Sequence, residues 1–459
     1  MKKIWWHSKY GDSLALIPLF EDAGHDITVF ISNKDSKQMY DGMTNKISYF
    51  PELQIKKGDL VVFDANDPIS ATQGDRLRKR GVSVFGGQVF ADKIEHDRIF
   101  GTKFMVDNGI KIPETWHFKK PEDCIKFLAD KGDRRWVFKP LGDAPSADTY
   151  VSSSSDDMID FIKSIKKKTE AILQAYVPGI EHPTYSWFAQ GKPCPNTFHT
   201  IETKRFASWR GGIGIGDNTG CQSSVEWAEN GLESREVEEG IGLCFDALEK
   251  EQFSGCLDLN CIIADADCTD FTADETVQGG ECLGGTEYKK GDMLGLEWTP
   301  RFGYNSIYCF AELINEPFDK FIIRLAEGDN SEIDVDTESF GVCTRVTILP
   351  YPIEGEDKFL EELYQKTADR PIKLNEHKGI TYNLIDVKKV NGELVTAGSD
   401  ALIVEVAGKF KDLDKATDEI CTAIEDIELK GKMARSDMFL RAQVELKKLE
   451  GLGYEKVEM

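Results

Sequence analysis

The stretch Leu294-Gly295-Leu296-Glu297-Trp298-Thr299-Pro300-Arg301-Phe302-Gly303 is the part of the sequence from which we interpret the rest. Its pattern predicts a short apolar strand that delivers one carboxylate, Glu297, and then a turn through Pro300 and Arg301. A carboxylate at the end of a buried strand is costly unless a cation meets it. A divalent metal that accompanies a nucleotide is the cation that we expect here.

The length, net charge and cysteine pattern of the sequence indicate a multidomain protein that binds neither nucleic acid nor membranes. A chain of 459 residues exceeds what one hydrophobic core usually holds, so we expect two to four domains. The formal net charge of -24 disfavours nucleic acid and anionic membranes as partners. No apolar run is long enough to span a membrane, and the first residues lack the pattern of a signal peptide, so we expect a cytoplasmic location. The 11 cysteines are spread singly, which is typical of buried free thiols.

The first ninety residues alternate between strand and helix patterns. Strands are predicted over 3–6, 26–31, 59–64 and 82–87, with helices over 12–23 and 69–80. This order predicts a doubly wound α/β domain over 1–90, which would bind ligands at the carboxyl ends of its strands. The first loop, residues 7–13, lies at that edge but has no GxGxxG pattern, and Asp12 or Ser13 could simply cap the helix.

We predict a second, larger unit over 91–330, in which 142–190 form a small lobe. Its first helix is expected over 91–108, and a strand over 135–140 brings Lys139 next to a loop of small residues, 141–148. A lysine beside such a loop suits triphosphate binding, although lysines at strand ends are also common on surfaces.

The remainder of the chain contains four further predictions. Glycines crowd residues 211–220, so we expect an irregular loop whose backbone approaches a ligand closely. A long helix is predicted over 229–249. The acidic segment 265–292 is expected to be a surface excursion between two hairpin strands, and 331–459 to be a β-rich C-terminal domain.

Two carboxylates on successive strands suggest a metal site. Asp258 lies in the strand predicted over 255–263, and antiparallel pairing with the strand of Glu297 would place both side chains on one face. Mg²⁺ takes one or two protein oxygens and leaves its other positions to phosphates and water, so this pair with Lys139 suits magnesium-ATP. Two acids on a polar, solvent-facing sheet would be the simpler alternative.

The order of these pieces resembles that of the ATP-grasp ligases and, among them, of the phosphoribosylamine–glycine ligase family. The similarity covers nearly the whole chain. It is carried by short motifs: Val84-Phe85-Gly86-Gly87, Gly101-Thr102-Lys103-Phe104-Met105, Val137-Phe138-Lys139, residues 172–181, Lys204-Arg205, Asn218-Thr219-Gly220 and Glu297-x-x-x-Arg301-Phe302-Gly303.

The resemblance implies a pre-ATP-grasp α/β domain, an ATP-grasp fold and a C-terminal β-rich domain, with ATP and Mg²⁺ (or Mn²⁺) as cofactors. The candidate nucleotide-binding residues are Lys103, Lys139, Gln174, Tyr176, Val177 and Glu181. The candidate substrate-binding residues are Lys204, Arg205, Asn218, Thr219, Gly220 and Arg301. The candidate metal ligands are Asp258, Glu297 and Thr299, and the candidate catalytic residues are Arg301 and Lys139.

Several positions depart from the family pattern. Residues 8–13 replace a glycine-containing first loop that helps to hold the phosphoribosyl substrate, and residues 146–149 lack the lysine of the phosphate loop. Thr299 stands where the family has an asparagine, and Tyr304 where it has an aspartate. These differences favour a substrate other than phosphoribosylamine.

We therefore expect an ATP-dependent ligase that joins a small carboxylate to an amine through an acyl phosphate. Arg301 would stabilise that intermediate, and residues 211–220 would close over it. A monomer or homodimer is expected. Three alternatives remain at this point: a nucleotide-binding protein of reduced activity, a kinase that stops at the acyl phosphate, and a phosphoribosylamine–glycine ligase itself.

Overall fold

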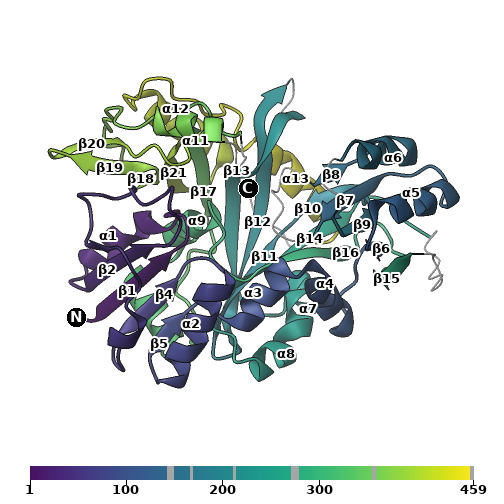
Figure 1. Cartoon of the computed structure of the whole chain (residues 1–459), viewed down its shortest axis with the longest axis horizontal. Helices are drawn as coiled ribbons and strands as arrows, with labels where there is room; N and C mark the ends of the chain where they lie inside the picture. Colours follow the sequence, from purple (N-terminus) through teal and green to yellow (C-terminus); the bar gives the residue numbers. More distant parts are fainter. Residues whose placement is uncertain (142–148, 166–168, 210–212, 270–278, 354–357, 455–459) are drawn as a thin grey trace.

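The computed structural model describes residues 1–141, 149–165, 169–209, 213–269, 279–353 and 358–454. Figure 1 shows the first domain in purple on one side, a small lobe on the other, and a large sheet between them. No helix in these ranges is long and apolar enough to cross a membrane. The predicted loop of small residues, 142–148, and residues 270–278 of the acidic segment lie outside the described residues.

The first domain has the doubly wound form that the alternating pattern predicts. Its parallel sheet has the order β3-β2-β1-β4-β5. The strands are β1 Lys3–Ser8, β2 Asp26–Ile31, β3 Lys46–Ile47, β4 Leu60–Phe63 and β5 Ser83–Phe85, and the helical segments are η1 Leu14–Leu16, α1 Ile17–Glu21, η2 Glu52–Gln54 and α2 Pro68–Lys79. The helix predicted over 12–23 is therefore shorter. Ser13 does not cap it, because its hydroxyl donates to Asp64 Oδ2 at 2.5 Å.

A pair of glycines ends the first domain after β5. Gly86 and Gly87 have φ values of +70° and +59°, and a Cβ atom at Gly86 would lie 2.4 Å from the carbonyl oxygen of Phe63. Only glycine adopts this backbone without strain, so the turn toward α3 (Val89–His96) depends on it.

The helix predicted over 91–108 is in fact two helices, α3 and α4 (Arg98–Asp107). The helical conformation is interrupted at Asp97, whose φ is −87° and ψ is 85°. Asp97 Oδ1 accepts a hydrogen bond from the backbone N–H of Phe100 at 3.0 Å. An aspartate in that role starts a new helix. The break sets the direction in which α4 leaves the first domain.

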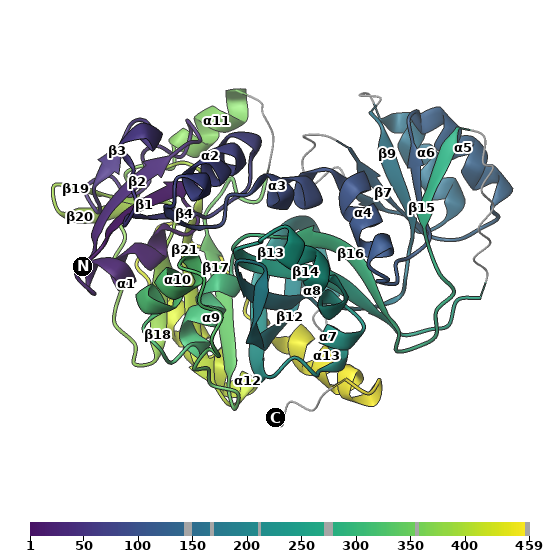
Figure 2. The same cartoon turned by 90° about the horizontal axis from the view of Figure 1, so that it is seen from below.

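The small lobe is an antiparallel sheet covered by two helices, seen apart from the rest in Figure 2. The sheet order is β15-β6-β9-β7-β8. Its elements are β6 Thr115–Phe118, α5 Pro121–Asp130, β7 Trp136–Pro140, β8 Tyr150–Val151, α6 Ser155–Ser164, β9 Ala171–Ala175 and β15 Gly280–Gly284. The lobe thus begins earlier than the predicted range 142–190. The acidic segment 265–292 is more than a surface excursion, because β15 within it pairs with β6.

The large sheet has nine strands in the order β10-β14-β11-β12-β13-β17-β21-β18, with β16 also paired to β14. They are β10 Gly179–Glu181, β11 Thr184–Ala189, β12 Lys192–Trp209, β13 Ile213–Asn230, β14 Gly255–Ala264, β16 Met293–Thr299, β17 Phe340–Thr347, β18 Ile380–Leu384 and β21 Leu402–Phe410. The C-terminal part is β-rich, as predicted, and because β17 pairs with β13 its strands β17, β21 and β18 continue the large sheet.

Helices and one hairpin complete the structure around the large sheet. They are α7 Arg235–Glu238, η5 Ile241–Cys244, α8 Phe245–Lys250, α9 Ser306–Leu313, α10 Phe318–Ala326, α11 Lys358–Gln365, β19 Val387–Val390, β20 Glu393–Thr396, α12 Leu413–Glu425 and α13 Leu440–Gly451. α9 packs on β13, β17 and β21. One hydrophobic cluster runs from Ile4 of the first domain to Leu449 of α13, so these parts share a core.

Two predictions in the middle of the chain were wrong. The glycine-rich residues from 213 onward belong to β13, which pairs with β12 as a long hairpin, so they are not an irregular loop. Cross-strand hydrogen bonds outweigh the low strand preference of glycine in this hairpin. The helix predicted over 229–249 is broken, because β13 continues to Asn230 and two short helices with η5 between them follow Gly231.

Candidate active site

A cavity of about 670 Å³ lies where the first domain, α3, α4, the small lobe and β16 meet. Its volume is in the range of small-molecule sites. Five of the predicted site residues line it: Lys139, Gln174, Glu297, Thr299 and Arg301. They come from β7, β9, β16 and the turn after β16, so tertiary packing brings together residues that are far apart in the chain.

The pairing of β14 with β16 confirms that Asp258 and Glu297 lie on neighbouring antiparallel strands. Asp258 is opposite Thr299, and Asn260 is opposite Glu297. Residues opposite each other, or two apart on one strand, share a face of the sheet, so these four side chains point to one side. Asn260 was not among the candidates, because its place depends on the register.

Oxygen atoms without partners gather on this face. Among the described residues, neither Asp258 Oδ1 nor Asn260 Oδ1 has a hydrogen-bond partner, although Asp258 is 3% and Asn260 6% exposed. Burial raises the pKa of Asp258 well above its usual value, and the carboxylates of Glu202 and Glu297 add to the effect. A divalent cation would relieve this charge, and the oxygen donors suit Mg²⁺.

Cations lie across from Glu297. Burial opposes ionisation of Glu297, but Lys139, Lys204 and Arg98 outweigh it and lower the pKa of the carboxyl. Burial lowers the pKa of Lys139, while Glu297 raises it. The Lys139 ammonium lies 3.5 Å from the carbonyl oxygen of Leu296, so it reaches the strand that carries Glu297.

The structure does not bring Lys103 into the cavity. Its ammonium pairs with Glu281 Oε1 at 2.8 Å, and its side chain is 47% exposed. Arg98, the first residue of α4, lines the cavity instead. Helix geometry explains the difference, because residues five apart on a helix point in different directions. The aspartate cap before Arg98 was the signal in the sequence that a helix starts there.

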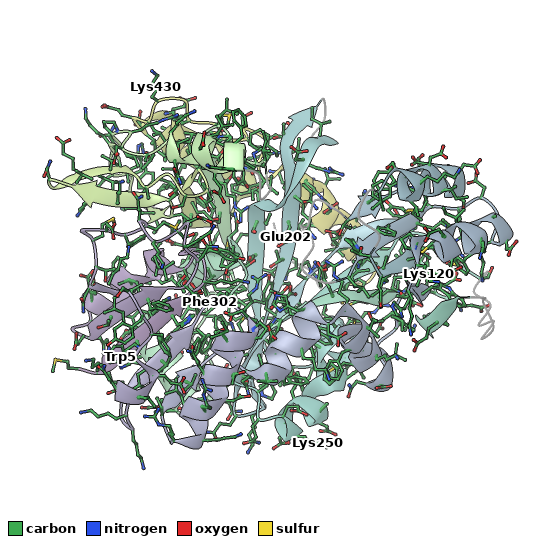
Figure 3. The ribbon with its side chains drawn as sticks, in the orientation of Figure 1. Trp5, Lys120, Glu202, Lys250, Phe302 and Lys430 are labelled. Atoms are coloured by element: carbon green, nitrogen blue, oxygen red, sulfur yellow. The ribbon has the colours of Figure 1, made fainter. Side chains whose placement is uncertain are left out.

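Glu181 and Lys204 lie beside the cavity and do not line it. Lys204 Nζ is 2.7 Å from Glu181 Oε2 and 3.5 Å from Glu202 Oε2. Glu202, labelled in Figure 3, lies on β12 near the middle of the molecule. Burial opposes the charge of Lys204, yet Glu181, Glu202 and Glu297 raise its pKa. Lys204 therefore stays charged. Although it lies on the large sheet, its charge also interacts with Glu297 in the cavity lining.

The remaining nucleotide candidates follow β9 into the segment that joins the lobe to the large sheet. Gln174 Nε2 donates to Thr115 Oγ1 at 3.0 Å. The ring of Tyr176 packs under the guanidinium of Arg135 at 3.7 Å, and Val177 is buried against the large sheet. Neither Tyr176 nor Val177 lines the cavity.

The remaining substrate candidates lie on the β12–β13 hairpin, away from the cavity lining. Arg205 and Asn218 are exposed and opposite each other, and Gly220 is also exposed. Thr219 Oγ1 donates to the carbonyl oxygen of Lys204 at 2.9 Å, and its own carbonyl oxygen accepts from Arg345 at 3.0 Å. The hairpin thus holds these residues outside the lining that contains Glu297.

Arg301 lies at the first-domain end of the cavity. Its Nε donates to Glu95 Oε1 at 2.8 Å, and its guanidinium lies 4.9 Å from the ring centre of Tyr304. Asn66 Nδ2 donates to the other oxygen of Glu95 at 2.8 Å. Sequence reasoning missed Glu95 and Asn66, since neither belongs to a recognisable motif.

Comparison with known proteins gives the fold class. A phosphoribosylamine–glycine ligase from Thermotoga maritima covers 95% of this chain and 99% of its own, with a TM-score of 0.68 and 18% identity. The biotin carboxylase domain of a Hydrogenobacter thermophilus 2-oxoglutarate carboxylase, solved with MgADP, ADP and bicarbonate, covers 98% of this chain and 95% of its own, with a TM-score of 0.62 and 11% identity. The chain therefore has the multidomain ATP-grasp fold, as its sequence predicted.

Within that class the chain resembles phosphoribosylamine–glycine ligase. The enzyme of that name from Methanocella arvoryzae is 22% identical over 381 residues, which are 79% of this chain and 77% of the relative. No protein-family model matches the chain. The relatives found on sequence and structure are ligases.

Proposed function

We propose that this protein is an ATP-dependent ligase that joins a carboxylate to an amine through an acyl phosphate. The observation that carries the proposal is that candidate metal ligands and positively charged side chains line the same nucleotide-sized cavity. Glu297 and Thr299 of β16 lie on one side, and Lys139 and Arg98 lie close to Glu297 in the same lining. We expect small-molecule substrates, a cytoplasmic location and a monomer or homodimer.

The phosphate end of the cavity would be formed by Lys139 and Arg98, whose charges match the phosphate oxygens of ATP. Asp258, Asn260, Glu297 and Thr299 would hold Mg²⁺, because their oxygens share one sheet face and two of them lack partners among the described residues. When bound, Mg²⁺ would neutralise phosphate charge and orient the transferring group. The apolar side chains of Ile172 and Leu296 and the amide of Gln174, which also line the cavity, are suited to the base.

Two steps follow from this placement. An oxygen of the carboxylate substrate attacks the γ-phosphorus, the bond to the β-phosphate oxygen breaks, and ADP leaves. The amine nitrogen then attacks the acyl carbon, the bond to phosphate breaks, and the nitrogen loses a proton as the amide forms. Arg301 is suited to stabilise the acyl phosphate, because a guanidinium can donate two parallel hydrogen bonds to its oxygens.

An ADP-release assay with MgATP, the twenty amino acids and a panel of amines tests the proposal. Release that requires both an acid and an amine supports the ligase. Release with an acid alone would indicate a kinase that stops at the acyl phosphate. If MgATP binds and no pair yields ADP, the ligase proposal is wrong and a nucleotide-binding protein of reduced activity is the better description.

Glu297→Gln tests the metal end of the site. The change removes a negative charge and keeps the shape, so we expect kcat to fall at least about 100-fold with the circular-dichroism spectrum unchanged. Glu287→Gln is the matched control, because Glu287 is exposed on the acidic segment and should leave kcat as it is. Wild-type kcat in Glu297→Gln would remove Glu297 from the proposed metal site.

The relatives' name points to one particular ligase, in which phosphoribosylamine is the amine and glycine the acid. This reaction fits the fold and the nucleotide-binding end of the cavity as well as a ligase reaction with another amine does. The substrate end of the cavity is what distinguishes it from a ligase with another amine.

A further inference from the structure

We propose that the amine substrate of this site is a phosphate-free primary ammonium compound, bound at the first-domain end of the cavity. This inference rests on the proposed ligase function and goes beyond it by naming the chemical class of the amine. The first-domain end consists of the loop after β1, the segment 65–68 after β4, α3 and residues 301–304.

Two backbone amides of the first loop are already engaged. In doubly wound domains the loop after the first strand commonly offers its N–H groups to phosphate. Here Asp64 Oδ1 accepts the backbone N–H of Lys9 at 3.1 Å, and Ser8 Oγ accepts that of Gly11 at 2.8 Å. A phosphate at this loop would meet a fixed carboxylate where it needs free donors.

The N-terminus of α2 is occupied in the same way. Asp67 lines the cavity, and its Oδ1 accepts the backbone N–H groups of Ile69 at 2.9 Å and Ser70 at 3.0 Å. The capping carboxylate satisfies the donors of the first turn and adds negative charge where the helix dipole would otherwise attract an anion. The N-terminus of α2 therefore offers no free amide to a phosphate, and the first loop has two fewer to offer.

Arg301, which lines this end, and Arg345, which lies near Asp12 outside the lining, already have carboxylate partners. Arg301 Nε lies 2.8 Å from Glu95 Oε1, and Arg345 Nε lies 3.1 Å from Glu405 Oε1. A buried pair of this kind resists separation, because breaking it leaves a charge without compensation. Each arginine charge is thus already compensated by a carboxylate, so Arg301 keeps N–H donors for the acyl phosphate but adds no net positive charge for a second phosphate on the amine.

Two further carboxyl groups lie behind the lining at this end of the cavity. Asp12 lies near Asp64, Arg345 and Arg301, and burial together with Asp64 raises the pKa of Asp12 to about 7. Burial, Asp12 and Asp64 also raise the pKa of Tyr304, which lines the cavity beside them. A cation bound beside Asp12 and Asp64 would favour their ionised forms, whereas an anion bound there would oppose ionisation.

Asn66 supplies the acceptor that an ammonium group needs. Its Nδ2 donates to Glu95 Oε2 at 2.8 Å and to the carbonyl oxygen of Pro300 at 3.2 Å, which fixes the orientation of the amide. Its Oδ1 has no hydrogen-bond partner among the described residues, although Asn66 is 3% exposed and lines the cavity. An unpaired buried acceptor is costly, and an N–H donor of the substrate would satisfy it.

One cation belongs to the loop itself. The ammonium of Lys9 lies 5.0 Å from the ring centre of Tyr10, and both residues line the cavity. Lys9 is suited to a carboxylate on the same ligand. The phosphate-free ammonium could thus be a simple diamine or a free amino acid, and the experiment must separate these two sources.

Calorimetric titration of the MgADP-loaded protein tests the inference without turnover. The probes are 1,4-diaminobutane, lysine and ribose 5-phosphate. We expect one of the two ammonium probes to bind at least tenfold more tightly than ribose 5-phosphate. Tighter binding of 1,4-diaminobutane identifies a diamine, tighter binding of lysine identifies an amino acid, and tighter binding of ribose 5-phosphate overturns the inference.

Two variants test the residues. Asp12→Asn and Asn66→Leu should each weaken binding of the preferred ammonium probe at least tenfold, with unchanged MgADP affinity as proof of folding. Asp22→Asn, which removes an exposed carboxylate of the same domain, is the matched control and should change nothing. Unchanged probe affinity in both test variants would overturn the assignment.

Turnover separates this inference from the ligase proposal. Phosphoribosylamine can be generated in the assay from ribose 5-phosphate and ammonia. If ADP release is best with phosphoribosylamine, the ligase proposal stands and the inference is wrong. If no acid and amine pair releases ADP, the ligase proposal fails and the inference fails with it.

Discussion

Positive and negative side chains alternate around the candidate site. Lys204 lies between Glu181 and Glu202, at 2.7 Å and 3.5 Å, and both it and Lys139 lower the pKa of Glu297. Charges this close in a partly dry cavity interact far more strongly than on an open surface. A substitution that changes one charge here should therefore alter ligand binding more than a comparable change elsewhere.

Arg98 and Lys103 form a test pair on one helix. Arg98→Ala should raise the KM for ATP about 10- to 100-fold, because a charge-assisted contact to phosphate is lost. Lys103→Ala should leave this KM within about twofold, because Lys103 pairs with Glu281 outside the cavity. Steady-state kinetics at saturating co-substrates measures both. A larger effect at Lys103 than at Arg98 would reverse the assignment.

His7 makes the stability of the first domain depend on pH. It packs among the rings of Phe30, Phe50 and Phe63, and burial lowers its pKa to about 4, although Asp67 opposes this. The unfolded chain binds a proton more readily, so this stabilisation is present above pH 6.5 and is lost as pH falls toward 4. Between pH 7 and pH 5 the wild type should lose about 2 kcal/mol more than His7→Leu.

Urea unfolding at the two pH values measures this difference for His7. Both proteins contain the same other titrating groups, so the comparison isolates the histidine. Equal losses in wild type and His7→Leu would show that His7 takes up its proton at the same pH in the folded and unfolded states, which would contradict the lowered pKa.

At the scale of single elements, the break between α3 and α4 controls the site. α3 supplies Glu95, which pairs with Arg301, and α4 begins with Arg98. The indole N–H of Trp298 on β16 donates to the carbonyl oxygen of Gly101 at 3.1 Å, which ties α4 to the strand that carries Glu297. The start of α4 thus positions a cation relative to the carboxylate.

Asp97→Ala removes the cap at this start. We expect a loss of about 1 kcal/mol in the free energy of unfolding and a rise in the KM for ATP, because the first turn of α4 frays and Arg98 moves. Asp97→Asn keeps a side-chain oxygen at the cap and should retain both values. Urea unfolding and ATP kinetics measure the two effects, and a stable Asp97→Ala variant with normal KM would contradict this role.

At the scale of the molecule, three parts of the chain line one cavity. The first domain, the small lobe and the large sheet each contribute to its lining, so a ligand held there contacts all three. A ligand that binds only the folded state stabilises it by an amount set by its concentration relative to Kd.

MgATP should therefore stabilise the whole protein. At 100 times its Kd the expected gain is about 2.7 kcal/mol, seen as a rise in the thermal midpoint. ATP with EDTA should give a smaller rise, and Glu297→Gln should reduce the difference that Mg²⁺ makes. Equal midpoints for wild type with MgATP and with ATP plus EDTA would argue against a metal in this site.

The elements that the sequence predicted are those with local signals. Alternating strands and helices with turn residues at their ends identified the first domain, and a short apolar run identified β16 with Glu297. The pattern failed for the glycine-rich part of β13, because strand formation there depends on pairing with β12. It predicted the β-rich C-terminal part but not that its strands continue the large sheet, because that depends on the pairing of β17 with β13.

Within the candidate site, too, some features follow from local sequence signals and others only from tertiary contacts. The sequence alone determined that Lys139 and Glu297 lie near the ends of strands and that Arg301 follows one, because strand ends are encoded locally. Only the tertiary structure decided that Asn260 is opposite Glu297 and that Arg98, rather than Lys103, enters the cavity. Cross-strand register and the direction of a helix depend on contacts between distant residues, and no local pattern encodes those contacts.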